Sequence, residues 1–367
     1  MSWSDWAAAE SGGIRAAGRW RQPRDLDAAG PEGKLAPDGR PVVSFASNDY
    51  LGLTQHPDVV AAAHAALDRW GAGSGSARLI VGSRPVHGDL EAALAEWKRA
   101  ERAVLFPTGF ATNLGVLTTL GGPGVLVCSD ELNHASIIDG CRLSRARVEV
   151  YRHRDLDHLE HLLTTVPAER AVVVTDTVFS MDGDLAEVGA LADLCARHRA
   201  LLVLDEAHAV LGPDPDLAGL DALRIGTLSK TVGALGGFVA GPASYTELVV
   251  NRARSYIFTT ALSPADAAAA LAGVGVIRSP EGRDLTARLR ANVARLRPGH
   301  PSPIVPVVFG TEERTLAAAA ALLDQGMLVP AIRPPTVPAG TSRLRVALSA
   351  AHSTSQVDGL AAALADL

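Results

Sequence analysis

Short apolar runs alternate with amphipathic segments through the middle of the chain. The runs at 103–106, 125–130, 171–179 and 200–208 are short enough for buried strands. Between them, apolar residues recur three and four positions apart, as in EVGALADLCARH at 187–198, which predicts amphipathic helices. Continuously apolar strands separated by helices predict an α/β fold, with a mostly parallel sheet covered by helices on both faces. In such sheets, ligands bind at the carboxyl ends of the strands.

The pattern differs at the two ends of the chain, which predicts three parts. Residues 1–40 predict a helix and an arm rich in glycine and proline. Residues 41–263 carry the alternation of strands and helices and are expected to form the larger domain. Over residues 264–367, alanine-rich helices with a few strands predict a smaller α+β domain.

Composition and charge exclude several classes of function. Of 367 residues, 47% are apolar and 20% are charged, which is typical of a packed globular protein. The formal net charge is −6 and no basic face stands out, so nucleic acid is not an expected partner. The three cysteines lack metal-ligand spacing and their number is odd, so we expect no metal site, no disulfide framework and a reducing cytoplasm. There is no signal-peptide pattern and no apolar run long enough to span a bilayer, so no membrane association is expected.

An acidic residue and a histidine end the apolar run at 200–208. Asp205 is followed three residues later by His208. A buried aspartate needs a partner, which can be a protonated pyridine nitrogen, a metal or an arginine. A capping aspartate at a strand-to-helix turn explains Asp205 about equally well. The letters DEAH also match a motif of NTP-driven helicases, but that class needs a GxxxxGK[ST] loop, which the sequence lacks.

Lys230 follows another short predicted strand, within GTLSKTVGALGG. Desolvation and nearby positive charge lower the pKa of a lysine amine, which can then form a Schiff base. The small neighbours leave room for a planar ring. A surface lysine in a loop is the ordinary alternative, but the spacing after Asp205 and the Gly/Thr/Ser surroundings favour the reactive interpretation.

Other positions carry weaker signals by themselves. In TGFATN, the amides of Gly109 and Phe110 at a helix N-terminus can hold a phosphate. Thr227, three residues before Lys230, can add a hydroxyl. His134, beyond the run at 125–130, can stack on a flat cofactor. Taken singly, each is more often an ordinary cap.

Taken together and in order, these motifs resemble the α-oxoamine synthase family, of the aspartate-aminotransferase fold. The landmarks are FASNDYLGL, LIVGSRPVHGDLE, TGFATN, NHASIIDG, TDTVFSMDGD, LDEAHAVLG, TLSKT and IRPPTVPAGTSRLRVALSAAH. The resemblance covers nearly the whole chain. It implies a fold-type-I large domain with a seven-stranded type of sheet, pyridoxal 5'-phosphate as cofactor, and a homodimer with its site at the subunit interface.

The resemblance also implies an activity. The segment IRPPTVPAGTSRLR, at 332–345, is most similar to the members that condense L-alanine with a pimeloyl thioester in biotin biosynthesis. The thioester would be carried by coenzyme A or by acyl carrier protein. Glycine C-acetyltransferase, 5-aminolevulinate synthase and serine palmitoyltransferase use the same chemistry with other substrates. A non-catalytic subunit of this fold would be expected to lack the lysine at 230.

The family's residue roles carry over position by position. Lys230 would hold the cofactor as a Schiff base, Asp205 would keep its pyridine nitrogen protonated, and His134 would stack on its ring; these are the expected catalytic residues. The remaining site residues are His208 and Ser180 near the phenolic oxygen, Gly109, Phe110 and Thr227 around the phosphate, Thr260 at the phosphate of the neighbouring subunit, Arg345 at the amino-acid carboxylate, and Arg19 and Thr336 along the acyl path.

Two departures from the family pattern concern one loop. The stretch 211–224 looks shorter than the usual connection between the Asp/His motif and the lysine strand. Ala209 stands where the family usually has glycine. Neither removes a reactive group, but both bear on loop conformation and on access of the substrate.

Overall fold

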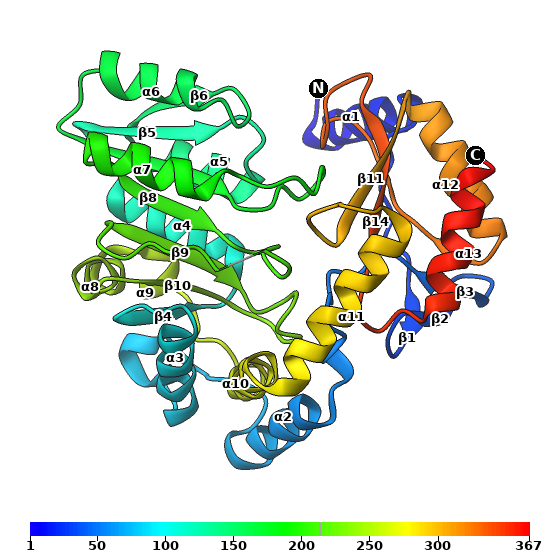
Figure 1. Cartoon of the computed structure of the whole chain (residues 1–367), viewed down its shortest axis with the longest axis horizontal. Coiled ribbons are helices and arrows are strands. Elements are labelled where there is room, and N and C mark those ends of the chain that lie inside the picture. The colour runs from blue at the N-terminus through cyan, green and yellow to red at the C-terminus, as the bar shows by residue number, and fades with distance from the viewer. Residues whose placement is uncertain (213) are drawn as a thin grey trace.

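A seven-stranded sheet forms the centre of the larger domain. The computed structural model describes residues 1–212 and 214–367. In the sheet, β10 is antiparallel to both of its neighbours, β4 and β9, and the other pairs are parallel, which confirms the predicted α/β class (Figure 1). The strands, in sheet order, are β4 (Arg102–Phe106), β10 (Gly237–Gly241), β9 (Ala222–Thr227), β8 (Leu201–Asp205), β7 (Arg170–Asp176), β5 (Val125–Asp130) and β6 (Arg147–Tyr151).

Helices cover both faces of this sheet, which explains why its strands are apolar throughout. In β8, Leu201 and Val203 pack into the core on one face, while Leu202 and Leu204 pack into the core on the other. The first face is covered by α4 (Gly109–Leu120), α5 (Ala135–Leu143), α8 (Ala243–Arg252) and α9 (Arg254–Ile257). The second is covered by α6 (Leu156–Thr165), α7 (Val188–His198), α3 (Pro85–Trp97) and α10 (Pro264–Arg278).

The segment before α3, at 45–84, packs on α10 and contains one helix and two short turns. The helix α2 (Pro57–Trp70) follows the short turn η1 (Leu53–Gln55) and packs on α10. The glycine-rich stretch that follows contains a π-helical turn, η2 (Arg78–Gly82), on which Leu79, Ile80 and Val81 are exposed.

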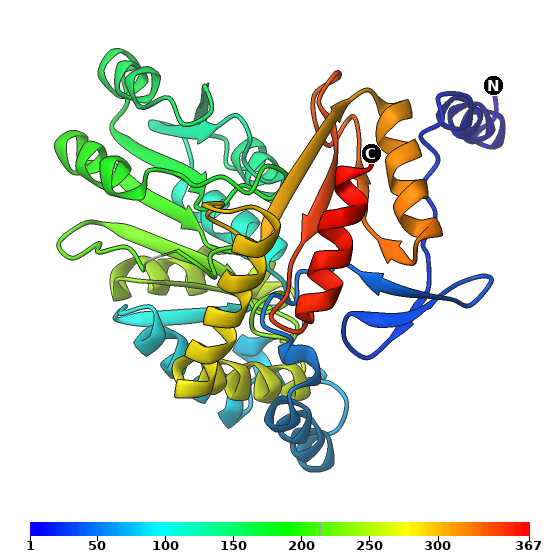
Figure 2. The ribbon, with the colours of Figure 1, turned by 45° about the vertical axis from the view of Figure 1, so that its right-hand side comes forward.

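Two smaller sheets bring the chain's beginning and end together. The antiparallel sheet β11 (Ile304–Gly310), β14 (Ser342–Ala347) and β13 (Ala331–Ile332) packs with α11 (Pro280–Leu296), α12 (Glu312–Asp324) and α13 (Thr354–Ala365). The other sheet contains β1 (Leu26–Ala28), β2 (Glu32–Leu35), β3 (Arg40–Ser44) and β12 (Met327–Leu328), and within it β3 pairs with β12 from the C-terminal part of the chain (Figure 2). The N-terminal helix α1 (Trp3–Ala16) has no buried residue.

The packing leads us to propose domain limits that differ from the predicted ones. Ala267, Ala270 and Val274 of α10 belong to the same core as β4 and β10. We therefore propose that the smaller domain begins with α11 rather than at residue 264. The strand β3, predicted to open the larger domain at residue 41, pairs with β2 and β12 instead, so we propose that residues 41–44 belong with the smaller domain. Within the described residues, no helix is long and apolar enough to cross a membrane.

Candidate functional site

The parallel strands of the large sheet end at one edge, where the three neighbouring strands β7, β8 and β9 each end in an acidic or hydroxyl residue. Asp176 ends β7, Asp205 ends β8 and Thr227 ends β9. Asp176 and Asp205 are direct neighbours in the strand register. This is the edge at which a ligand is expected to bind.

Asp205 is buried and accepts hydrogen bonds from neutral donors. Its Oδ2 lies 2.7 Å from Nδ2 of Asn113, and its Oδ1 lies 2.9 Å from the backbone nitrogen of Ala207. Asn113 lies on α4, where its Nδ2 also donates to the hydroxyl of Ser136, at 2.9 Å. Within the described parts of the chain, no cation forms an ion pair with the Asp205 carboxylate. The charge of Asp205 is oriented but remains available to a cationic ligand.

Lys230 lies half-buried in the turn between β9 and β10. Backbone bonds from Gly233 to Lys230, at 3.1 Å, and from Ala234 to Leu228, at 2.9 Å, fix this turn. Burial lowers the pKa of Lys230, and the positive charge of Arg345 adds to this, although Asp205 and Asp176 oppose it. An amine in these surroundings is less fully protonated and therefore a better nucleophile and base.

His134 caps α5 beside the same acids. Its backbone nitrogen donates to Oδ2 of Asp176, at 2.7 Å, and its Nδ1 lies 2.7 Å from the hydroxyl of Ser136. Burial and Asp205 raise the pKa of Asp176 well above its usual value. Desolvation and the charge of Lys230 lower the pKa of His134, against the pull of Asp205. A neutral imidazole at the mouth of the site suits stacking on a flat ring.

His208, three residues after Asp205, is linked to the segment before α2. Its Nδ1 lies 2.6 Å from the hydroxyl of Tyr50. That hydroxyl donates its one proton to Oδ1 of Asn48, at 3.0 Å, so Nδ1 of His208 donates to Tyr50. Burial, together with the charges of Lys230 and Arg345, lowers the pKa of His208 well below its usual value, and burial raises the pKa of Tyr50 to about 12. Both side chains are therefore neutral at physiological pH.

Arg345 is buried and approaches from β14. Its Nη2 donates to Oδ1 of Asn48, at 3.1 Å, and its Nε donates to the backbone oxygen of Ser180, at 2.5 Å. Its charge is felt by Lys230 and by His208, in agreement with a place in the same site. Its two neutral contacts leave its charge without a carboxylate partner among the described residues.

The N-terminus of α4 meets the end of β9 closely. A Cβ atom on Gly109 would lie 3.2 Å from Cβ of Thr227, and one on Gly237 would lie 2.5 Å from the backbone nitrogen of Gly109. Thr108 caps the helix, and the side chain of Phe110 is 44% exposed. The structure therefore brings the predicted phosphate-binding residues together at a helix N-terminus, which attracts anions.

Three predicted residues lie outside this cluster. Thr260 is exposed between α9 and α10. Arg19 and Thr336 line a hollow of about 690 Å³ with Trp20 and Arg333, and its described lining includes none of the residues around Lys230. Arg19 also forms an exposed ion pair with Glu312, at 2.8 Å.

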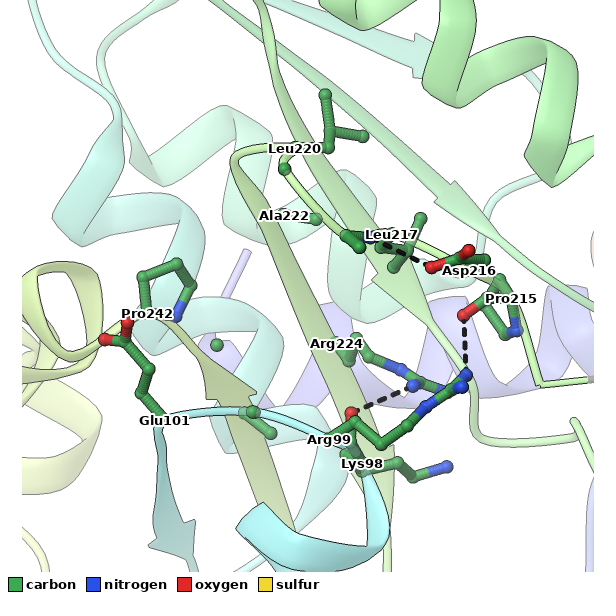
Figure 3. A pocket seen from close by; sticks show the side chains of 15 residues that line it. Lys98, Arg99, Glu101, Pro215, Asp216, Leu217, Leu220, Ala222, Arg224 and Pro242 are labelled. Carbon is green, nitrogen blue, oxygen red and sulfur yellow. Dashed lines mark hydrogen bonds between the residues drawn. The ribbon is translucent and has the colours of Figure 1, made fainter.

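The stretch 211–224, which departs from the family pattern, is attached to the large sheet by an ion pair of Arg224. Arg224 of β9 is buried and donates to the backbone oxygen of Lys98 at 3.1 Å (Figure 3). It also pairs with Asp214. Pro213, within the stretch 211–224, lies outside the described residues. Ala209 donates its backbone nitrogen to the oxygen of Glu206, at 3.0 Å.

The individual residues that the sequence reasoning missed are the supports of the cluster: Asn48, Tyr50, Asn113 and Asp176. Each lies within a landmark motif, but nothing in a single sequence distinguishes Asn48, Tyr50 and Asn113 from capping or core residues. Asp176 offered the clearest signal, because it ends an apolar strand in the same way as Asp205 does.

Comparisons with known proteins agree on one family. The pattern of the aminotransferase class I and II family matches residues 40–364. The 8-amino-7-oxononanoate synthase of Anaeromyxobacter dehalogenans (strain 2CP-1) is 52% identical, with 98% of this chain and 95% of that protein covered. Among solved structures, a variant of the serine palmitoyltransferase from S. paucimobilis with a bound PLP–myriocin aldimine has a TM-score of 0.91 at 31% identity, over 98% of this chain and 96% of that one. The 8-amino-7-oxononanoate synthase from Francisella tularensis has a TM-score of 0.75 at 25% identity, over 89% and 97%. The chain belongs to the aminotransferase class I and II family, and within it to the 8-amino-7-oxononanoate synthases.

Proposed function

We propose that the chain condenses L-alanine with a pimeloyl thioester, with loss of carbon dioxide, to give the 8-amino-7-oxononanoate of biotin biosynthesis. The observation that carries this proposal is the 52% identity to a synthase of that name over 98% of the chain, together with a half-buried lysine beside Asp205. The enzyme is a transferase that depends on pyridoxal 5'-phosphate.

The donor set at the sheet edge fits this cofactor. Lys230 offers an amine of lowered pKa, and Asp205 offers a buried carboxylate that has no cation partner among the described residues. Gly109 and Thr227 lie where a phosphate is favoured by the N-terminus of α4. When bound, pyridoxal phosphate supplies an electron sink for the charge that develops at the substrate's α-carbon.

The chain's own residues then act around the amino acid. Lys230, with its lowered pKa, takes the proton from the α-carbon and returns a proton after carbon dioxide has left. Arg345 holds the carboxylate, because a buried guanidinium without a carboxylate partner favours a bidentate anion. Asp205, held by Asn113, keeps the cofactor's ring nitrogen protonated.

His134 and His208 act through their neutral forms. His134 would hold the ring of the cofactor by stacking, and His208 with Ser180 would hold its phenolic oxygen. The hydrogen bond that His208 donates to Tyr50 fixes the orientation of the imidazole. The acyl carbonyl forms its new bond to the α-carbon while the carbon–sulfur bond breaks and the thiol leaves.

The acyl donor and the assembly complete the proposal. Arg19 and Thr336 line the route of the pimeloyl chain, carried by coenzyme A or acyl carrier protein, through the hollow that they share. We propose a homodimer, in which Thr260 of one subunit reaches the phosphate-binding region of the other. We place the enzyme in the cytoplasm, where its three buried cysteines, Cys128, Cys141 and Cys195, would stay reduced.

Product analysis tests the function. Purified protein is incubated with L-alanine and either pimeloyl-CoA or pimeloyl acyl carrier protein, and the product is identified by mass spectrometry. We expect 8-amino-7-oxononanoate from L-alanine, with far less product from glycine or L-serine. The Lys34→Ala variant, which alters an exposed lysine on β2, serves as the matched control for Lys230→Ala. Turnover of L-serine with palmitoyl-CoA, and none of L-alanine, would instead identify a serine palmitoyltransferase.

A further inference from the structure

His153, just beyond the end of β6, is held between two carboxylates. Its Nδ1 lies 2.9 Å from Oδ1 of Asp130, and its Nε2 lies 2.8 Å from Oδ2 of Asp184. An ionised carboxylate only accepts hydrogen bonds, so both ring nitrogens must carry protons, and the side chain is a cation. Burial lowers the pKa of His153, but the hydrogen bonds to the two aspartates outweigh this and raise it to about 9.

The groups around His153 hold this arrangement in place. The backbone nitrogen of His153 donates to Oε1 of Glu131, at 2.7 Å. Arg154 contributes a second cation near Asp184, at 3.4 Å. The ring of Phe179 meets the imidazole edge-on, with centroids 4.3 Å apart. The imidazolium is thus fixed from the end of β5 and from the segment after β7.

Asp184 and Phe179 are the two ends of a tight turn. The backbone nitrogen of Phe179 donates to the oxygen of Asp184, at 3.0 Å, and that of Gly183 donates to the oxygen of Phe179, at 2.8 Å. Gly183 has a φ of +69°, and a Cβ atom there would lie 2.0 Å from the backbone oxygen of Ile304. The strand β11 of the smaller domain therefore rests directly on the turn at 179–184.

Two arginines of β14 reach the same turn. Arg345 donates its Nε to the oxygen of Ser180, at 2.5 Å, and Arg343 pairs with Asp182. Residues two apart on a strand point to the same side, so both guanidinium groups meet the turn together. The position of Arg345 therefore depends on where the turn is held.

We infer that His153 is a positioning residue for the amino-acid substrate: by tying Asp184 to Asp130, it fixes the turn at 179–184, which in turn orients Arg345 toward the substrate carboxylate. The inference rests on the proposed function, because that function gives Arg345 its ligand. His153 itself does not need to touch the substrate or the cofactor.

The loss of the charge has a defined consequence. The side chain of Asp130 is 1% exposed, and Oδ1 of Asp184 is buried without a hydrogen-bond partner among the described residues. With a neutral residue at 153, the negative charges of Asp130 and Asp184 are no longer neutralised by the imidazolium between them. The two carboxylates then repel each other and move apart toward solvent. The turn then shifts with Asp184 and carries the contact between Ser180 and Arg345 with it.

Steady-state kinetics of the holoenzyme test the inference. For His153→Gln, at saturating pimeloyl-CoA, we expect KM for L-alanine to rise about tenfold, with kcat within about twofold and an unchanged visible spectrum of the bound cofactor. The matched control is His161→Gln on α6, an exposed histidine, which should change neither constant.

A second variant separates positioning from folding. Asp184→Asn keeps the shape of the turn but removes the charge that His153 holds, and it should raise KM for L-alanine in the same way. An unchanged KM in both folded variants overturns the inference, as does an equal fall of kcat and kcat/KM. If His153→Gln does not fold, the KM of Asp184→Asn decides. The proposed function is read separately, from product formation by the wild-type enzyme.

Discussion

Lys98 and Lys230 both lie in the large-sheet domain, in opposite kinds of surroundings. Lys98 is 8% exposed, and its Nζ lies 2.8 Å from Oε2 of Glu206 and 4.0 Å from the ring centroid of Trp97. Lys230 is half-buried, and within the described residues no carboxylate forms an ion pair with it. A buried cation with its counterion is part of the structure, whereas one without it is poised to lose its proton.

Asp205, which ends β8, and Glu206, which follows it, differ in the same way. Glu206 is paired with Lys98 and accepts a hydrogen bond from Nε of Arg224, at 2.6 Å. The carboxylate of Asp205, one residue earlier, accepts among the described residues only from Asn113 and the backbone of Ala207. Successive residues along an extended chain point to opposite sides. Glu206 therefore contacts Lys98 and Arg224, which Figure 3 shows beside the loop at 215–220, whereas Asp205 faces the site. In this protein, the residues proposed to react, Lys230 and Asp205, are ones whose charges have no partner among the described residues.

The largest expected effect is that of removing the unpaired lysine. Lys230→Ala should lower kcat by at least about a thousandfold, because both the attachment to the cofactor and the proton acceptor are lost. The circular dichroism spectrum should remain that of the folded protein. Substantial turnover by this variant would break the comparison.

The unpaired acid comes next. Asp205→Asn should still bind the cofactor but slow exchange of the α-proton of L-alanine by about a hundredfold, because a neutral amide no longer keeps the ring nitrogen protonated. Deuterium incorporation, followed by NMR, measures this step. Exchange at the wild-type rate would show that the carboxylate at 205 has no such role.

A cation that is paired with carboxylates should contribute to the free energy of unfolding rather than to the chemical step. His153, paired with Asp130 and Asp184, makes this contribution depend on pH. Its pKa is raised to about 9 in the folded protein, from an ordinary value near 6.5. The stabilisation is thus complete below about pH 6.5 and is lost as the pH rises toward 9. Urea unfolding of wild type and His153→Gln should differ by roughly 2 kcal/mol more at pH 6 than at pH 9. A difference that does not change with pH would contradict a charged His153.

The smallest effect is expected at the paired lysine. Lys98→Met should lower the free energy of unfolding by about 1.5 kcal/mol, because Glu206 keeps Arg224 as a partner. The kcat of the folded enzyme should remain unchanged. A loss of activity without a loss of stability would remove the contrast between the two lysines.

Sequence patterns predict the site residues that lie at the ends of strands. They do not predict those that reach the site only because segments distant in sequence pack together. Asp205, Lys230 and Thr227 follow apolar strands of one parallel sheet, so their convergence at one edge can be predicted. Asn48 and Tyr50 reach the site from a segment more than a hundred residues away, through the contact of Tyr50 with His208. The alanine-rich pattern of α10 predicts a place in the smaller domain and contains no sign of the core that the helix shares with β4 and β10, which is why we propose a different domain limit.

The most direct test of the account is to locate the covalent bond to the cofactor. The chain has three lysines, Lys34, Lys98 and Lys230, so reduction of the holoenzyme with borohydride followed by peptide mass mapping leaves few alternatives. We predict a phosphopyridoxyl group on Lys230 alone. A reduced adduct on Lys98 or Lys34, or no adduct on any of the three, would contradict the account.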